Sequence, residues 1–85
     1  MNFGVDWGSG IRKELHLLWA TAPDPAAVRN AAEKVEQQLG TDPYQSGKHL
    51  SEGLWRIVVP PLVAHYSIDA SSRSVEITDV RLLAE

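Results

Sequence analysis

The chain contains no cysteine among its 85 residues. This absence excludes disulfide bonds, zinc sites built on thiolates and cysteine nucleophiles. The longest apolar runs fall well short of the about 20 residues that a helix needs to cross a bilayer, and the N-terminus carries no signal-peptide pattern. From these absences we expect a cytoplasmic protein with no membrane partner.

An excess of positive charge is also missing. Eight lysines and arginines stand against eleven aspartates and glutamates, which gives a formal net charge of −3. Neither half of the chain, divided at Gly40, is basic. Strong nonspecific attraction to a phosphate backbone is therefore not expected. Any chemistry on a nucleic acid would need a small local cluster of basic side chains.

Several common signatures of enzymatic sites are missing as well. The three histidines, His16, His49 and His65, are scattered, and no two of them have the spacing of zinc ligands. Residues 8–10 (Gly-Ser-Gly) lack the spacing of a glycine-rich phosphate loop and indicate a turn between a strand and a helix. No G-x-S-x-G nucleophile elbow is present. We therefore expect neither a metal ion nor a cofactor.

The composition, 44% hydrophobic and 22% charged, is that of an ordinary globular protein. A chain of this length has room for one hydrophobic core and not for two. We expect one domain over residues 1–85. Its first stretch, residues 2–7, alternates polar and apolar side chains and predicts a short strand with one buried face.

Two helices are predicted next. Residues 10–21 repeat apolar side chains at helical spacing, with Ser9 as the expected N-cap. A second apolar stripe covers residues 25–40, where Asp24 suits the N-cap and Gly40 is expected to end the helix. Because the link between the two helices is short, they should form an antiparallel hairpin.

The second half of the chain predicts three strands. Residues 41–52 have no period and are predicted as a loop. The apolar runs 53–59 and 62–68 are separated by two prolines and predict neighbouring antiparallel strands. In the last strand, residues 74–83, the apolar parity switches after Asp79, which indicates a bulge. The order β-α-α-β-β-β predicts a two-layer α+β domain with the helical hairpin packed on one face of the sheet.

The central strands carry the most informative polar residues. Arg56 lies inside an apolar strand, where a charge must reach a carboxylate, the sheet edge or an external anion. Glu52, Glu76 and Asp79 are the alternative structural partners for it. His65 falls on the sheet surface expected to face away from the helices, as a half-exposed sheet histidine or as a general acid or base.

Four other residues near these strands also have two interpretations. Tyr66, on the opposite sheet face from His65, packs in the core or donates a proton. Lys48 and His49 are solvated loop residues or contacts for a ligand. Trp55 joins the core or lines a groove for a partner segment.

Together these segments resemble the RelE/ParE superfamily of toxins from bacterial type II toxin–antitoxin systems. The matching residues are 42–43 (Asp-Pro), 50–57 (Leu-Ser-Glu-Gly-Leu-Trp-Arg-Ile), 65–69 (His-Tyr-Ser-Ile-Asp) and the closing strand 75–81, with the helical hairpin before them. The resemblance implies a curved antiparallel sheet whose first strand lies next to the last. It also implies a site on the sheet face turned away from the helices.

The resemblance suggests roles for individual residues, because the mRNA-cleaving members of the family position RNA with basic side chains. It implies catalytic roles for Arg56 and Arg81, as phosphate ligands, and for His65, as acid or base. It implies substrate-binding roles for Lys48, His49 and Tyr66. Val58 and Val63 stand where the family usually has basic residues, and removing one such donor typically costs on the order of 3 kcal/mol of transition-state stabilisation.

Two functions therefore stay open. The first is a toxin that inhibits translation as a ribosome-dependent endoribonuclease acting on mRNA. The second is a non-catalytic module of the same fold, a ParE-like gyrase inhibitor or a degenerate toxin, that acts through protein–protein binding. The resemblance implies a cognate antitoxin as partner in either case, with the ribosome and mRNA or DNA gyrase as the target.

Overall fold

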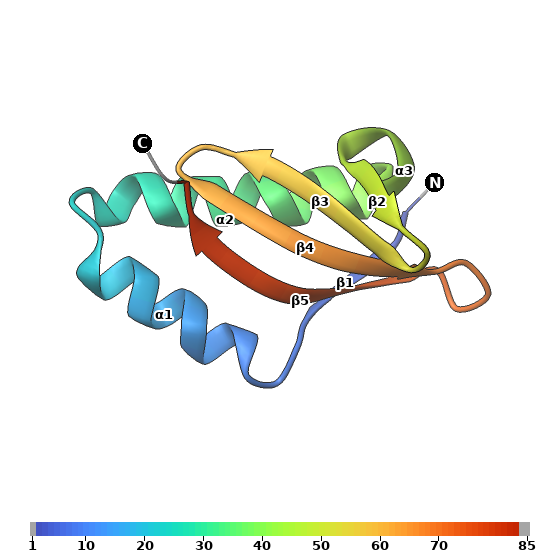
Figure 1. The fold of residues 1–85 in the computed structure, drawn as a ribbon, viewed down its shortest axis with the longest axis horizontal. Coiled ribbons are helices and arrows are strands. Elements are labelled where there is room, and N and C mark those ends of the chain that lie inside the picture. The colour runs from blue at the N-terminus through green and yellow to red at the C-terminus, as the bar shows by residue number, and fades with distance from the viewer. Residues whose placement is uncertain (1, 84–85) are drawn as a thin grey trace.

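The structure, a computed structural model, describes residues 2–83. Met1, Ala84 and Glu85, at the ends of the expected domain, lie outside the described residues. The elements in chain order are β1 (Gly4–Trp7), α1 (Ile11–Thr21), α2 (Pro25–Thr41), α3 (Pro43–Ser46), β2 (Lys48–Ser51), β3 (Leu54–Val59), β4 (Leu62–Asp69) and β5 (Ser74–Leu82). They form two layers, with the helices on one face of a five-stranded sheet (Figure 1).

The strand order in the sheet is β1-β5-β4-β3-β2. The predicted α+β class and the position of the first strand next to the last are confirmed. The pairs β5–β4, β4–β3 and β3–β2 are antiparallel, whereas β1 runs parallel to β5. The sheet is therefore mixed, and the expectation of a wholly antiparallel sheet is corrected at this edge.

The start of α1 differs from the prediction. Gly10 precedes the helix and no side chain within residues 2–83 caps it, so the assignment of Ser9 as the N-cap is wrong. The carbonyl of Gly8 accepts the N–H of Ile11 at 2.8 Å instead, and the main chain closes this turn without a side chain. None of the residues of α1, all of them described, is fully buried.

The start of α2 agrees with the prediction. The side chain of Asp24 accepts the N–H of Ala27 at 3.2 Å, and Pro25 occupies the first turn, where its missing N–H removes no helical bond. The helix continues through Gly40 and ends at Thr41. The predicted apolar stripe faces the sheet, and its fully buried members are Val28, Ala31, Val35 and Leu39.

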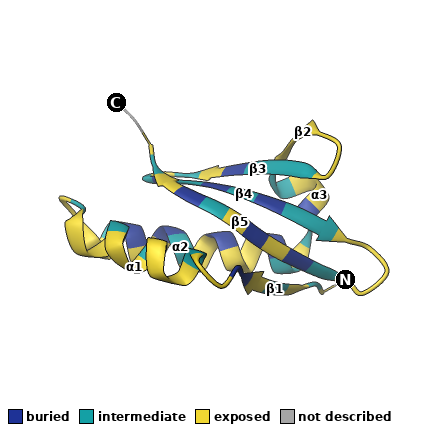
Figure 2. Cartoon of the chain, turned by 60° about the horizontal axis from the view of Figure 1, so that its bottom comes forward, coloured by how far each residue is buried: buried dark blue, intermediate teal, exposed yellow. Residues whose placement is uncertain are grey.

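Side chains alternate between the two faces of the sheet along β3, β4 and β5, as Figure 2 shows for β5. On the face under the helices, which we call the covered face, the buried residues of these three strands are Ile57, Leu62, Ala64, Tyr66, Val75, Ile77 and Val80. The opposite face, which we call the free face, is turned away from the helices. This alternation follows the predicted assignment of faces.

The predicted bulge in the last strand is confirmed. His65 of β4 pairs with Asp79, whereas the next residue, Tyr66, pairs with Ile77. Thr78 is therefore an extra residue on β5 without a partner on β4. Such a bulge moves every later side chain of the strand to the other face, which explains the switch in apolar parity.

The segment predicted as a loop, residues 41–52, contains α3 and β2, so that prediction is wrong. Asp42 caps α3 by accepting the N–H of Tyr44 at 3.1 Å and that of Gln45 at 3.2 Å. β2 forms an antiparallel edge with β3. All four residues of β2 are exposed, so the strand has no alternation that the sequence could reveal. No helix within residues 2–83 is long and apolar enough to cross a membrane.

Candidate functional site

A row of polar side chains crosses the free face of the sheet. Lys48 of β2 pairs with Arg56 of β3, Arg56 pairs with His65 of β4, and His65 pairs with Asp79 of β5. Directly paired residues point to the same side of a sheet. The strand register thus places these four residues side by side, and we call them the charged row.

The neighbouring row on the free face contains Val58, Val63 and Arg81. Arg81 reaches the charged row, because its Nε donates a hydrogen bond of 2.9 Å to Oδ2 of Asp79. Its side chain is still 71% exposed. Val58 is exposed, so the two valines form an apolar margin beside the charged row.

His65 also contacts Asp79. Its Nδ1 lies 3.4 Å from Oδ2 of Asp79, within the distance of an ion pair, although Nδ1 is buried and makes no well-aligned hydrogen bond within residues 2–83. We regard the contact as electrostatic, because the distance is short enough while the alignment is poor. The side chain of His65 is 21% exposed, and the ring nitrogen that does not contact Asp79 is Nε2.

Arg56 is half-buried, and among the described residues it has no carboxylate within ion-pair distance. The alternatives Glu52 and Glu76 do not pair with it, and Asp79 pairs with His65 and Arg81 instead. A half-buried guanidinium in this position is open to an external anion. Within residues 2–83 no group of three or more His, Cys, Asp or Glu side chains could hold a metal ion.

The structure does not bring all the predicted substrate-binding residues together. Lys48 lies in the charged row, but Tyr66 is fully buried on the covered face, and its hydroxyl donates a hydrogen bond of 2.7 Å to the carbonyl of Pro43. Burial, and to a smaller extent the nearby carboxylate of Asp42, raises the pKa of Tyr66 to about 12. His49 lies on the side of Tyr66 and not in the charged row.

Trp55, for which core and groove were alternatives, belongs to an aromatic cluster that includes α3. Its ring centroid lies 4.8 Å from that of His49, 5.7 Å from that of Tyr44 and 6.3 Å from that of Tyr66. Trp55 is half-buried and packs against the main core. The cluster holds the segment of α3 and β2 against the sheet.

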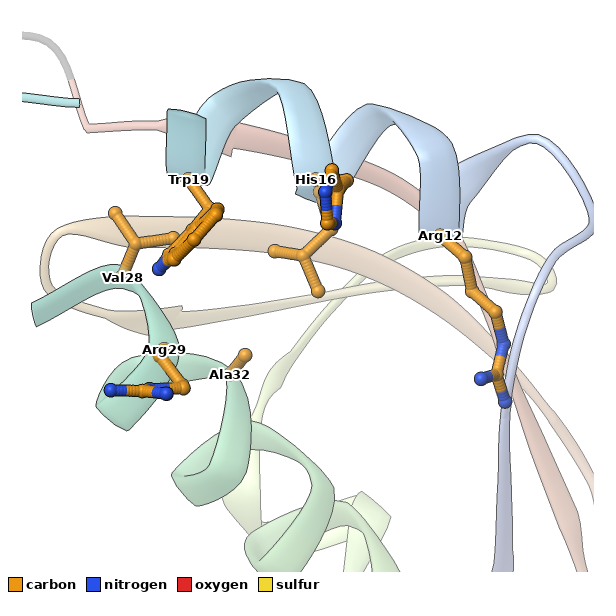
Figure 3. Close-up of a pocket in the computed structure, with 7 residues that line it drawn as sticks. Arg12, His16, Trp19, Val28, Arg29 and Ala32 are labelled. Atoms are coloured by element: carbon orange, nitrogen blue, oxygen red, sulfur yellow. The ribbon is translucent and has the colours of Figure 1, made fainter. Parts of the chain in front are cut away.

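A cleft lies between α1 and α2, away from the charged row. It has a volume of about 290 Å³, and we call it the helical cleft; its lining residues are Arg12, Leu15, His16, Trp19, Val28, Arg29 and Ala32. Figure 3 shows Trp19 projecting from α1 towards Val28 and Arg29 of α2, with His16 on the same helix. The lining is mainly apolar, with the two arginines contributed by different helices. No sequence pattern pointed to this cleft, because it depends on how the two helices pack.

No protein-family model matches the sequence, and no curated protein matches it. Among solved structures, a chain of the toxin–antitoxin complex RelBE2 from Mycobacterium tuberculosis is similar with a TM-score of 0.83 and 23% identity, covering 100% of this chain and 95% of that one. A conserved hypothetical protein from Helicobacter pylori has a TM-score of 0.61 and 12% identity, with 94% and 93% covered. The chain therefore has a RelE-like fold.

Proposed function

We propose that this protein is the toxin of a toxin–antitoxin pair and that its free face binds and cleaves mRNA on the ribosome. The RelE-like fold, shared with a chain of the RelBE2 toxin–antitoxin complex, supports the first part. The observation that carries the second part is the charged row. Lys48 and Arg56 in this row, and Arg81 beside it, gather three cations on one face of a protein whose net charge is −3.

Each of these side chains has a role in the proposed reaction. RNA is cleaved when a ribose 2′-hydroxyl attacks the adjacent phosphorus, loses its proton to a base, and the departing 5′-oxygen gains a proton. Arg56 and Arg81 bind the phosphate and stabilise the charge that develops on it, with Lys48 in support. Nε2 of His65, the ring nitrogen that does not contact Asp79, accepts the proton of the 2′-hydroxyl, and the resulting imidazolium gives a proton to the departing 5′-oxygen.

The acidic net charge favours cleavage that depends on the ribosome. Free RNA is repelled by the protein as a whole, and three cations provide only a local attraction. Val58 and Val63 further leave Arg81 as the only charged residue of the three in the neighbouring row. A larger assembly that holds the mRNA in place would supply the positioning that this surface lacks.

Programmed ribosomes test this proposal. We expect the purified protein to cleave their mRNA, and we expect Arg56→Ala and His65→Ala each to lower the rate by about 100-fold, which corresponds to about 3 kcal/mol. Arg29→Ala and His16→Ala are matched controls, since they change the same residue types on the helices. Cleavage that survives the combined Arg56→Ala and His65→Ala change would reject this site.

The second candidate is a non-catalytic module that binds a protein target such as DNA gyrase. The observation that favours it is the apolar margin at Val58 and Val63, where the exposed Val58 suits a protein contact. A supercoiling assay with purified gyrase separates the two candidates. Inhibition of supercoiling without cleavage on ribosomes would support the second one.

We also propose that the helical cleft binds a segment of the antitoxin as an amphipathic helix with acidic side chains. An apolar cleft between two helices accepts the apolar face of a third helix. Trp19 is 37% exposed, which leaves an aromatic anchor available to a partner. Arg12 and Arg29 on the two sides of the cleft are complementary to acidic residues.

Co-purification with the product of a small reading frame next to the gene tests this partner. We expect Trp19→Ala, and the double change Arg12→Glu with Arg29→Glu, each to weaken the complex by about 10-fold or more. Lys34→Glu is the matched control, because it reverses a charge on α2 outside the cleft. Equal weakening by Lys34→Glu would contradict docking in the helical cleft.

A further inference from the structure

One member of the charged row is a carboxylate, at the β5 end of the row. Asp79 belongs to the charged row and is hydrogen-bonded to Arg81 at 2.9 Å. Its negative charge offsets part of the charge of Arg81 and repels phosphate. If this surface only bound phosphate, Asp79 would weaken that binding. The presence of Asp79 therefore needs an explanation other than phosphate binding.

The bulge in β5 is what brings Asp79 to this place. Ile77 points into the core, and in a regular strand residue 79 would point the same way. Because Thr78 is an extra residue, the chain turns the Asp79 side chain to the free face, directly opposite His65. Bulges frequently redirect a side chain next to a functional site.

The contact between the two residues involves one ring nitrogen of His65 and one carboxylate oxygen of Asp79. Nδ1 of His65 is buried, and the carboxylate oxygen Oδ2 of Asp79 lies 3.4 Å from it. The same oxygen accepts the hydrogen bond from Arg81, which holds the carboxylate in place. A carboxylate next to one ring nitrogen favours the hydrogen on that nitrogen and leaves the other as a free acceptor.

From this geometry we propose that Asp79 is a positioning residue that keeps the hydrogen of neutral His65 on Nδ1 and turns the unprotonated Nε2 towards the substrate. This inference assigns a further residue role within the proposed function. The expected effect on the rate of mRNA cleavage rests on that function. The tautomer itself is a property of the folded protein and does not depend on that function.

The kinetic test separates positioning from binding. If Asp79 positions His65, Asp79→Ala lowers kcat by about 10- to 100-fold, while KM for the programmed ribosome stays equal or falls because a repulsive charge is gone. Glu76→Ala is the matched control: it removes an exposed carboxylate from the same strand without touching His65. An unchanged kcat in Asp79→Ala, or an equal loss in Glu76→Ala, overturns the inference.

A spectroscopic test does not require activity. Nitrogen-15 NMR of the His65 ring at alkaline pH, where the ring is neutral, distinguishes a hydrogen on Nδ1 from one on Nε2. We expect the Nδ1–H form in the native protein and a shift towards Nε2–H in Asp79→Ala. The Nε2–H form in the native protein, or identical spectra for both proteins, overturns the inference. If the native protein cleaves no mRNA but shows the expected tautomers, the proposed function fails and the positioning of His65 stands.

Discussion

His65 and Tyr66 are neighbours on β4, yet their side chains lie in different surroundings on the two faces of the sheet. Tyr66 has no exposed surface on the covered face, and its hydroxyl is hydrogen-bonded to Pro43. His65 on the free face keeps part of its ring in solvent, and its Nδ1 has only a loosely aligned contact with Asp79. The hydroxyl of Tyr66 has a hydrogen-bond partner inside the protein, whereas Nδ1 of His65 has none among the described residues.

The other residues of the covered face and the free face also differ in burial and polarity. The buried residues of the sheet are apolar apart from the hydroxyl of Tyr66 and the indole N–H of Trp7, which donates to Glu36 of α2, and they hold the two layers together. The side chains of the charged row are half-buried or exposed, and they add little to that packing. We therefore expect changes on the covered face to affect stability and changes on the free face to affect activity.

The largest expected effect comes from a cavity on the covered face. Ile77→Ala removes a fully buried side chain and should lower the free energy of unfolding by about 2–5 kcal/mol. Val58→Ala, on the free face, should change it by less than about 0.5 kcal/mol, since Val58 is exposed. Urea denaturation measures both values. Similar losses for the two variants would show that the faces do not differ in this way.

A smaller loss of stability is expected from a change at Gly47, just before β2. A methyl group added at Gly47 would lie 2.6 Å from the carbonyl oxygen of Arg56 and closer still to the hydroxyl of Tyr66. Gly47→Ala should therefore destabilise the protein by about 1–3 kcal/mol. Gly10→Ala is the control, because no other described atom lies within 4 Å of its added methyl group. Thermal melting curves that coincide for the two variants would contradict this packing.

The smallest expected effect is a loss of stability at high pH that comes from Tyr66 on the covered face. The pKa of Tyr66 is raised to about 12, so its stabilising contribution is complete below about pH 10, the pKa in the unfolded chain, and is lost as the pH rises towards 12. At about pH 11.5 the native protein should have lost about 2 kcal/mol of stability from this residue relative to pH 9.

Tyr66→Phe provides the control for this pH effect. The variant should be less stable by about 1–2 kcal/mol near neutral pH, because the carbonyl of Pro43 loses its partner. It cannot ionise, so the difference from the native protein should shrink or reverse at about pH 11.5. Parallel stability curves for the two proteins between pH 9 and pH 11.5 would contradict the burial of a neutral Tyr66.

Local chemistry made much of this fold predictable. The N-cap at Asp24, the apolar stripe of α2 and the strands at β3 and β4 depend on residues close together in the chain. Even the bulge in β5 left a sequence signal, because a strand that buries one face must change parity where a residue is inserted. These features follow from periodicity and from the short-range bonding of single side chains.

The less predictable elements have no such local signal. The strand β2 is exposed throughout, so its pairing with β3 produces no apolar alternation. The start of α1 is closed by a main-chain hydrogen bond, which does not require the side chain of Ser9. The helical cleft depends on how α1 packs against α2, and no single segment carries that information.

The sequence by itself determined which strand residues alternate in β3 and β4, that α1 and α2 form and which strand side is polar, because these depend on the period of apolar side chains. Only the tertiary structure decided that Lys48, Arg56, His65 and Asp79 lie side by side, since register between strands is set by packing across the sheet and by one inserted residue. Strand alternation places His49 and Tyr66 on the opposite face from that row, because each is adjacent in the chain to one of its members.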